Sequence, residues 1–495
     1  MSKRRNSTIV KGVQLFLFLA VVVVGATGKV WADAAAAAAP TSLKGFMNYD
    51  DFTWVNGNTH EKDFPMDGKI FSPELLFDSN YTWQASNPND HMINGSTATN
   101  MSNEVEVQHV GLGGDFHVDN IHARFMSEFG MYANGIPRND QTPARGGWNI
   151  QLGTMYFTEA YGGFHLDIAG TDGMNVELGQ FPSYVGLYSF YNSENWTYQA
   201  SYVSSNTPWF FTGMRIQFFP NDTLKIEPWL INGWQTYGAF DDGIGGIGFN
   251  FGFELRWAPN PDLVVISNNY AGPDNAVSPN CVKYHTDDSL VVKYLDDPKS
   301  GGITKMAFSL TCDAGMQQGP LYMGVGSAGT TTAAGLVVGP DNYLTVGPDQ
   351  ESFLGFMFYD RTWFAKDTMA FTFGGGAMTN PGRYLALLPS IGGATAATYA
   401  TTPGTGAFST GPGLLWQAWD ADVCLQIMPS QYYTFDLEWT HRHSSIPYFN
   451  GHGGETSTDG WTAGGATGST QLSGGFVPDL QNDEDLIMGA FMIHI

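Results

Sequence analysis

Residues 247–257 read Ile-Gly-Phe-Asn-Phe-Gly-Phe-Glu-Leu-Arg-Trp. Every second residue is apolar, so in an extended chain the apolar side chains share one face and the polar ones the other. Tight turns at 220–222 and 258–262 bound this stretch and the shorter runs before it. A strand that crosses a bilayer obliquely needs about 9–11 residues, whereas an average strand has about 5–6. The pattern therefore predicts a transmembrane antiparallel β-barrel.

The N-terminus predicts export. Basic residues precede an apolar run at 13–24, and Ala32 offers a small-residue cleavage site. A secretory signal peptide has an apolar core of about 7–15 residues, while a spanning helix needs about 20. We expect a signal peptide at 1–32, a flexible Ala-rich mature N-terminus at 33–41, and a barrel over 42–495.

The charge and composition narrow the class of protein further. The chain has 22 basic and 47 acidic residues; the first 32 residues hold five of the basic ones and none of the acidic ones, so cleavage leaves a net charge of −30. Such a field repels nucleic acid and favours cations at an opening. Charged and aromatic residues each make up 14%, with 61 glycines. This composition is typical of a barrel with aromatic girdles and disfavours a soluble enzyme.

Alternating segments recur along the chain, and their count predicts about 16 strands within a range of 14–18, since bacterial single-chain barrels have even numbers. We read 56–99 as mostly loop and 271–351 as a long external loop. The expected strands include 42–51, 104–116, 121–132, 148–161, 352–363, 368–378, 414–428 and 486–495.

The segment 182–208 breaks the alternation. It carries six Tyr and Trp residues among polar ones, too many aromatic rings for a loop in water. If 220–222 is a periplasmic turn, the ends of this segment lie at the outer rim. We therefore predict a loop that folds into the barrel mouth, with Glu194, Asn195 and Gln199 lining a constriction.

Five further charged residues share the polar face of adjacent predicted strands. They can form a salt-bridged wall and also create a transverse field in the channel. These predicted channel-lining residues are Arg215, Lys225, Glu227, Glu254 and Arg256.

Three cysteines are too few for a disulfide framework. Cys281 and Cys312 bracket a polar insertion that an oxidising compartment would allow to pair. We predict a Cys281–Cys312 disulfide in the external loop and leave Cys424 single.

No motif for metal, cofactor or catalysis is evident. The histidines of 441–455 fit no zinc spacing. The acidic pairs at 287–288 and 296–297 are interpreted as solvated loop charge, with calcium or lipopolysaccharide phosphates bridged by divalent ions as the alternative. Neither a phosphate-binding loop nor a Ser/His/Asp set is recognisable. We expect no catalytic residue, metal or cofactor.

Five short motifs follow one another along the chain. They are 176–182 (VELGQFP), 195–198 (NWTY), 208–213 (PWFFTG), 232–234 (NGW) and 438–444 (EWTHRHS). By these motifs and their order, the chain resembles the putative β-barrel porin-2 (OmpL-like) family over most of residues 42–495. The resemblance implies an outer-membrane porin and carries over no catalytic residue.

The sequence thus favours a water-filled channel in the bacterial outer membrane for passive diffusion of small hydrophilic solutes, with a preference for cations. Its partners would be outer-membrane lipid and lipopolysaccharide, the solutes and the barrel-assembly machinery, and not nucleic acid. The oligomeric state stays open, with a homotrimer as one alternative. Two other functions stay open: an outer-membrane barrel enzyme, and a structural sheath that encloses a periplasmic partner such as a cytochrome.

Overall fold

The computed structural model describes residues 46–88, 91–96, 98–136, 149–239, 244, 249–273, 278–383, 411–452 and 480–495. The predicted signal peptide and Ala-rich N-terminus lie outside these ranges. Among the residues described, no helix is long and apolar enough to cross a membrane.

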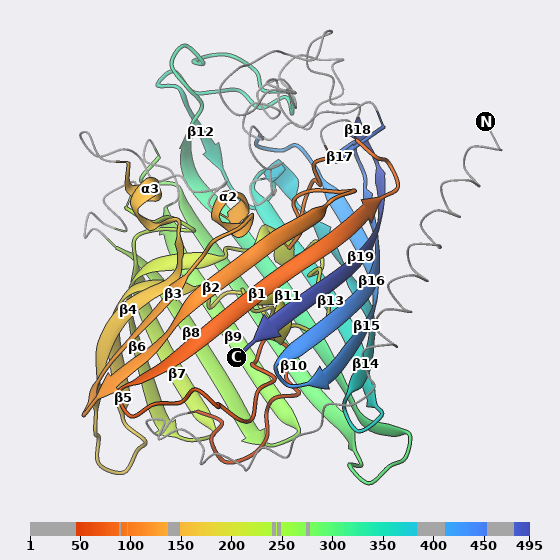
Figure 1. Cartoon of the computed structure of the whole chain (residues 1–495). Coiled ribbons are helices and arrows are strands. Elements are labelled where there is room, and N and C mark those ends of the chain that lie inside the picture. The colour runs from red at the N-terminus through yellow and green to blue at the C-terminus, as the bar shows by residue number, and fades with distance from the viewer. Residues whose placement is uncertain are drawn as a thin grey trace, which may run out of the picture.

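Sixteen antiparallel strands form one closed sheet, as predicted (Figure 1). Each strand pairs with its neighbours in the chain, and β19 pairs with β1 to close the circle. The strands are β1 (Phe71–Gln84), β2 (Val105–Val118), β3 (Ile121–Ser127), β4 (Phe157–Leu166), β5 (Met174–Pro182), β6 (Phe210–Asn221), β7 (Leu224–Ile231), β8 (Asn250–Asn260), β9 (Leu263–Pro273), β10 (Val282–Asp296), β11 (Ile303–Tyr322), β13 (Ser352–Phe364), β14 (Met369–Thr379), β15 (Gln417–Ser430), β16 (Tyr433–Ser444) and β19 (Asp483–His494).

The two edges of the barrel differ. Short turns join the strands at the lower edge in Figure 1, whereas long connections leave the upper edge. Small elements lie in those connections: α2 (Tyr132–Gly135), α3 (Ile150–Thr154), η2 (Asn192–Glu194), η3 (Ser204–Asn206), β12 (Tyr343–Val346), η5 (Pro381–Arg383), β17 (Phe449–Asn450) and β18 (Leu480–Gln481). We call these edges the short-turn edge and the long-loop edge.

The alternation that predicted the barrel matches the two faces of its wall. In β8, Phe251, Phe253 and Trp257 point outward and are 39%, 38% and 44% exposed, while Glu254 points inward and is 5% exposed. In β16, Trp439 points outward and Glu438 lies buried in the lumen. The wall is thus apolar outside and polar inside.

The prediction of a long external loop at 271–351 is wrong. Residues 282–296 and 303–322 are two of the longest strands, β10 and β11, and β12 follows. The pattern was hidden because β10 is polar on both faces: Asp287 points into the lumen and Asp288 outward. The acidic pair at 287–288 therefore lies in a strand and not in a solvated loop.

Three other expectations also need correction. Residues 71–84 form the long strand β1 inside the predicted loop 56–99. Residues 46–50 form turns where a strand was expected. Residues 150–154 form the short helix α3, with Asn149 as its N-cap, where we expected the start of a strand.

The predicted Cys281–Cys312 disulfide is also wrong. Cys281 lies beside Gly319, near the upper end of β11, whereas Cys312 pairs with Asp288. Seven residues of strand separate these positions, or about 23 Å. A disulfide requires Cα atoms within about 7 Å. Cys424 is buried and makes no disulfide.

We expect peptide mapping without reductant, after thiol alkylation of the folded protein, to recover no Cys281–Cys312 cross-linked peptide. The distance between the two strand positions forbids that bond in the closed barrel. Recovery of the cross-linked peptide from natively alkylated protein would contradict the register of β10 and β11.

Candidate functional site

The connection between β5 and β6 folds into the lumen and is held there by hydrogen bonds to inward side chains of the wall. The Glu438 carboxyl group accepts the backbone N–H of Tyr198 at 2.7 Å and that of Gln199 at 3.0 Å. Arg361 donates to the carbonyl oxygen of Trp196 at 3.0 Å. We call residues 183–209 the inner loop.

Further wall residues complete this anchorage. Asp78 accepts hydrogen bonds from Asn192 Nδ2 at 2.9 Å and from the Tyr198 hydroxyl at 2.8 Å. Asp420 accepts the hydroxyl of Ser201, and Arg442 donates to the carbonyl oxygen of Ala200 at 3.3 Å.

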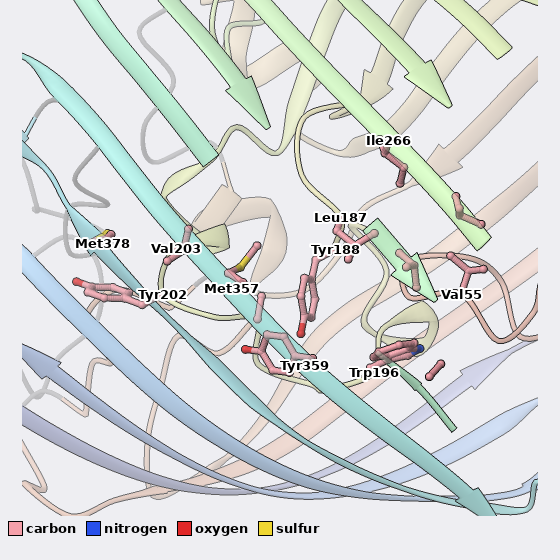
Figure 2. Close-up of a cluster of buried hydrophobic side chains, with 14 of the residues drawn as sticks. Val55, Leu187, Tyr188, Trp196, Tyr202, Val203, Ile266, Met357, Tyr359 and Met378 are labelled. Carbon is pink, nitrogen blue, oxygen red and sulfur yellow. The ribbon is translucent and has the colours of Figure 1, made fainter. Parts of the chain in front are cut away.

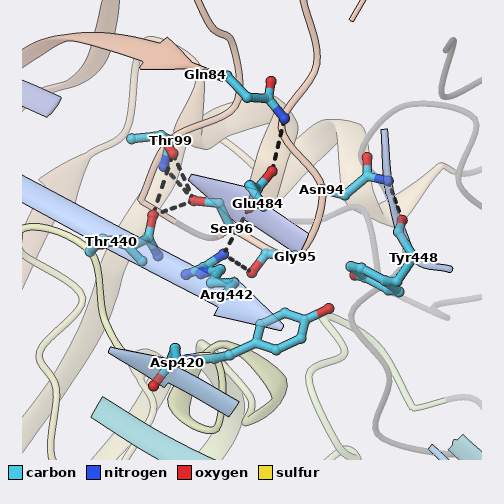
Figure 3. Close-up of polar contacts among 12 residues, drawn as sticks. Gln84, Asn94, Gly95, Ser96, Thr99, Asp420, Thr440, Arg442, Tyr448 and Glu484 are labelled. Atoms are coloured by element: carbon cyan, nitrogen blue, oxygen red, sulfur yellow. Dashed lines mark hydrogen bonds and ion pairs between the residues drawn. The ribbon is translucent and has the colours of Figure 1, made fainter. Parts of the chain in front are cut away.

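Arg442 also holds a second inward connection, between β1 and β2. It donates to the carbonyl oxygen of Gly95 at 2.8 Å (Figure 3). Ser96 donates to Gln199 Oε1 of the inner loop at 2.6 Å, and Gln84 donates to Glu484 at 2.8 Å. The two connections thus support one another inside the barrel.

The segment before β1 closes the short-turn edge. Met47 N donates to the Asp222 carbonyl in the β6–β7 turn, at 2.7 Å, and the Tyr49 hydroxyl donates to the Ala258 carbonyl in β8, at 2.5 Å. On the other side of the barrel, Lys62 N donates to Gln431 Oε1 in the β15–β16 turn, at 2.9 Å. We call residues 46–70 the N-terminal segment.

The N-terminal segment and the inner loop meet in the lumen. Trp196 donates its backbone N–H to Asn56 Oδ1 at 2.6 Å and its indole N–H to the Trp54 carbonyl at 3.0 Å. Gly57 N donates to the Glu194 carbonyl at 3.0 Å. Figure 2 shows Trp196 beside Val55 in one buried cluster, which wall residues such as Tyr359 complete.

The lumen wall from β1 to β8 carries three groups of ion pairs. Arg124 contacts Glu159, Glu74 and Asp115 at 2.7–2.8 Å. Farther round the barrel, Lys225 lies 2.9 Å from both Glu227 and Glu254. We call this set the charged wall; it comprises Glu74, Asp115, Arg124, Glu159, Glu177, Arg215, Lys225, Glu227, Glu254 and Arg256.

Aromatic rings fix the orientation of one of these charges. The guanidinium carbon of Arg215 lies 4.4 Å from the ring centre of Phe181, 4.9 Å from Tyr161 and 5.5 Å from Trp229. The same guanidinium pairs with Glu177. Cation–π contacts and an ion pair together leave Arg215 little freedom to swing.

Two cavities separate the charged wall from the inner loop. One, of about 210 Å³, is lined by Arg215, Lys225, Glu227, Glu254 and Arg256 on one side and by residues 182–190 on the other. The second, of about 240 Å³, lies at the short-turn edge between Glu74, Arg124, His494, Glu194 and residues 64–67. We call them the wall cavity and the edge cavity. The Arg124–Glu159 pair joins the two linings, at 2.8 Å.

All five charges predicted on β6–β8 thus face one cavity. Of the three loop residues predicted to line the channel, one faces a cavity and two are buried. Glu194 faces the edge cavity and accepts the Ser189 hydroxyl at 2.5 Å. Asn195 and Gln199 are 2% and 0% exposed and bond to Ser189 N and Ser96, so the structure assigns them to holding the loop rather than to a channel lining.

Burial has the largest influence on the pKa of the Glu194 carboxyl group. Burial raises the pKa of its carboxyl group to about 7, and the hydrogen bond from Ser189 and the nearby His494 only partly oppose this rise. Glu194 therefore changes charge near neutral pH.

The anchoring residues of the inner loop were missed by the sequence reasoning. Asp78, Arg361, Asp420, Glu438 and Arg442 sit at inward positions of strands whose outward side chains are mostly apolar. Charged residues at consecutive inward positions, such as Asp436 and Glu438, were a signal that the lumen there is occupied by groups able to hydrogen-bond. Across the ranges that the structure describes, no group of three or more His, Cys, Asp or Glu is placed to hold a metal ion.

A closed barrel with an apolar outer belt and a charged interior defines a transmembrane β-barrel of the bacterial outer membrane. Residues 75–411, more than half of the chain, match the family described as putative beta-barrel porin-2, OmpL-like. The chain belongs to this family. By the convention of such barrels, the short-turn edge faces the periplasm and the long-loop edge the exterior.

Several solved structures align with most of the chain at low sequence identity. OmpT of Vibrio cholerae shares 6% identity at a TM-score of 0.44, covering 87% of this chain and 99% of that one. The outer membrane channel DcaP of Acinetobacter baumannii shares 10% at 0.43, covering 89% and 100%. An anion-selective porin from Comamonas acidovorans shares 9% at 0.42, covering 86% and 99%. No curated protein sequence matches the chain. The family match alone therefore supports the assignment.

We expect Glu438→Leu to loosen the inner loop and raise single-channel conductance in planar bilayers. The substitution leaves two buried backbone N–H groups without an acceptor, at a cost of about 1–3 kcal/mol each. Thr434→Val is the matched control, because Thr434 lies on the same inward face of β16. Equal conductance for Glu438→Leu, Thr434→Val and wild type would contradict this anchoring role.

Deletion of residues 46–66, with residues 1–45 kept, should also raise conductance, because it removes the partners of Trp196 and opens the periplasmic end. Lys62→Ala is the control within the same segment: its ion pair with Asp51 is exposed and contributes little. A deletion variant that folds, by its shift in gel mobility on heating, yet conducts like wild type would show that the segment does not close the route.

Proposed function

We propose that this protein is a porin through which small hydrophilic solutes diffuse passively along the charged wall. The observation that carries the proposal is the pair of cavities between that wall and the inner loop. Most hydrogen bonds from the wall to the backbone of the inner loop come from β13–β16, whereas on the β3–β8 side Tyr184 and Tyr191 touch the wall and the two cavities lie beside them. A solute there meets fixed charges instead of apolar side chains.

The route is narrow. The wall cavity and the edge cavity, about 210 and 240 Å³, each hold a few water molecules or one small solute, at about 30 Å³ per water. The Arg124–Glu159 pair and the Ser189–Glu194 hydrogen bond lie between them. Passage requires these contacts or the N-terminal segment to move, so the resting channel has low conductance.

The charge of the route favours cations. The charged wall holds six carboxyl groups and four Lys or Arg side chains, and His122 and His494 pair with two of those carboxyl groups. Glu194 adds another carboxyl group at the edge cavity. A surplus of negative groups along a narrow path concentrates cations and excludes anions. The excess of acidic residues in the whole chain acts in the same direction.

The two alternative functions receive less support. A sheath around a periplasmic cytochrome needs a wide lumen, but the inner loop and the N-terminal segment fill much of this lumen with a packed cluster that includes Val55 and Trp196. An enzyme needs convergent nucleophile and base. The inward charged groups pair with one another instead, as in the Lys225–Glu254 contact at 2.9 Å.

Glu194→Lys tests the proposal. In a salt gradient across a planar bilayer, we expect the reversal potential to move towards that of an anion-preferring channel, because one negative group at the edge cavity becomes positive. Asp167→Lys is the matched charge change at an exposed turn position outside the route. Ion flow that is insensitive to Glu194→Lys, or absent for wild type, would refute the proposed route.

The same measurement should depend on pH. With a pKa of about 7, Glu194 is largely charged at pH 8 and largely neutral at pH 6, so wild-type cation preference should weaken as the pH falls through this range. Glu194→Gln should lack that part of the pH dependence. An identical profile for the variant would assign the titration to another group.

A further inference from the structure

A polar patch interrupts the outward face of the barrel on three adjacent strands. Register pairs Ser267 of β9 with Asp288 of β10 and Asp288 with Cys312 of β11, while Asn269 pairs with Thr286. Asp288 is exposed and its neighbour Asp287 is fully buried in the lumen, so Asp288 points out of the barrel. We call these five residues, Ser267, Asn269, Thr286, Asp288 and Cys312, the lateral patch.

The lateral patch lies at mid-height of the wall. Asp288 is the seventh residue of the fifteen-residue β10. At a strand tilt of about 45°, it lies about 14 Å below the outer end of the strand and about 19 Å above its periplasmic end. The hydrocarbon band of such barrels is about 25 Å tall. The Asp288 carboxyl group thus falls well inside the hydrocarbon band.

A carboxyl group that faces hydrocarbon is unfavourable unless it meets hydrogen-bond donors. The patch satisfies itself only in part: Thr286 donates to Asp288 Oδ2 at 3.1 Å, and Asn269 donates to Ser267 at 3.3 Å. Two other outward polar groups in the described strands have shorter hydrogen bonds. Ser79 donates to the Glu106 carbonyl at 3.0 Å, and Asp360, nearer the periplasmic end, accepts the Tyr294 hydroxyl at 2.8 Å.

An apolar groove adjoins the patch on its outer side. Its volume is about 600 Å³, and Asn269 and Thr286 belong to both features. Aromatic side chains of Phe251, Phe253 and Tyr284 border it, and the small Ala271 and Ala314 form part of its lining. A hollow beside hydrogen-bonding groups is typical of a protein–protein interface, because side chains of the partner can fill the hollow and its polar groups can pair with those beside it.

We propose that the outward face of β9–β11 is the interface with a second copy of this chain. The patch is chemically self-complementary: the Ser267 hydroxyl and the second N–H of the Asn269 amide supply donors, and the Asp288 carboxyl group, which receives one hydrogen bond from Thr286, supplies an acceptor. Around a symmetry axis through this face, each copy can offer its donors to the partner's Asp288, and the outward aromatic residues of one copy can enter the groove of the other. The carboxyl group then leaves hydrocarbon for a hydrogen-bonded interface. This inference does not depend on what the lumen conducts.

The test compares the mass of the purified full-length protein in mild detergent, by light scattering corrected for detergent, with that of two tryptophan variants. Ser267→Trp places a bulky side chain in the patch and should weaken association by about tenfold or more. Leu112→Trp places the same residue on β2, on the far side of the barrel, and should leave the oligomer intact. A monomeric wild type, or equal effects of the two variants, would overturn the proposal.

A third variant separates protein from lipid as the partner of this face. Asp288→Leu should weaken association if the carboxyl group bonds across an interface. If the face instead meets lipid, the same change leaves a monomer with a higher unfolding temperature, and native mass spectrometry of wild type shows a monomer with bound phospholipid. Either of the latter results would overturn the proposal.

Discussion

The hydrogen-bonded seam between β1 and β19 is the contact on which the rest of the structure depends. Nine residues from Leu76 to Gln84 pair in register with the C-terminal strand. In hydrocarbon an open sheet edge would leave a row of backbone N–H and C=O groups unpaired, so only the closed circle is stable in a membrane. Closure also creates a lumen in which connecting loops can fold away from lipid.

Within that lumen the two sides of the wall have different roles. On one side, buried groups such as Asp78, Glu438 and Arg361 bond to the inner loop, several of them to its backbone, so the loop has one defined position. On the other side, the charged wall forms its own ion pairs, and Arg215 is clamped by rings. The polar groups that face the inner loop hold that loop in place, whereas the polar groups of the charged wall line the cavities.

The sequence predicted the barrel, its 16 strands and the inward charges of β6–β8, because those strands alternate cleanly between lipid and lumen. It failed for β10, where Lys283, Asp287 and the outward Asp288 make both faces polar and remove the period of two. It also failed for the Cys281–Cys312 pair and for the roles of Asn195 and Gln199. Those depend on strand register and on which wall the inner loop contacts, and neither is encoded in local pattern.

The N-terminal segment constrains the order in which the molecule is assembled. Lys62 and Gln431 are 369 residues apart in sequence, yet they are hydrogen-bonded. The segment also contacts the β6–β7 turn and the tip of the inner loop. No partial circle of strands presents all of these partners, so this segment can make its full set of contacts only after the strands up to β16 have assembled. Until this segment docks, Trp196 lacks its Asn56 and Trp54 partners and the periplasmic end of the lumen lacks its cover.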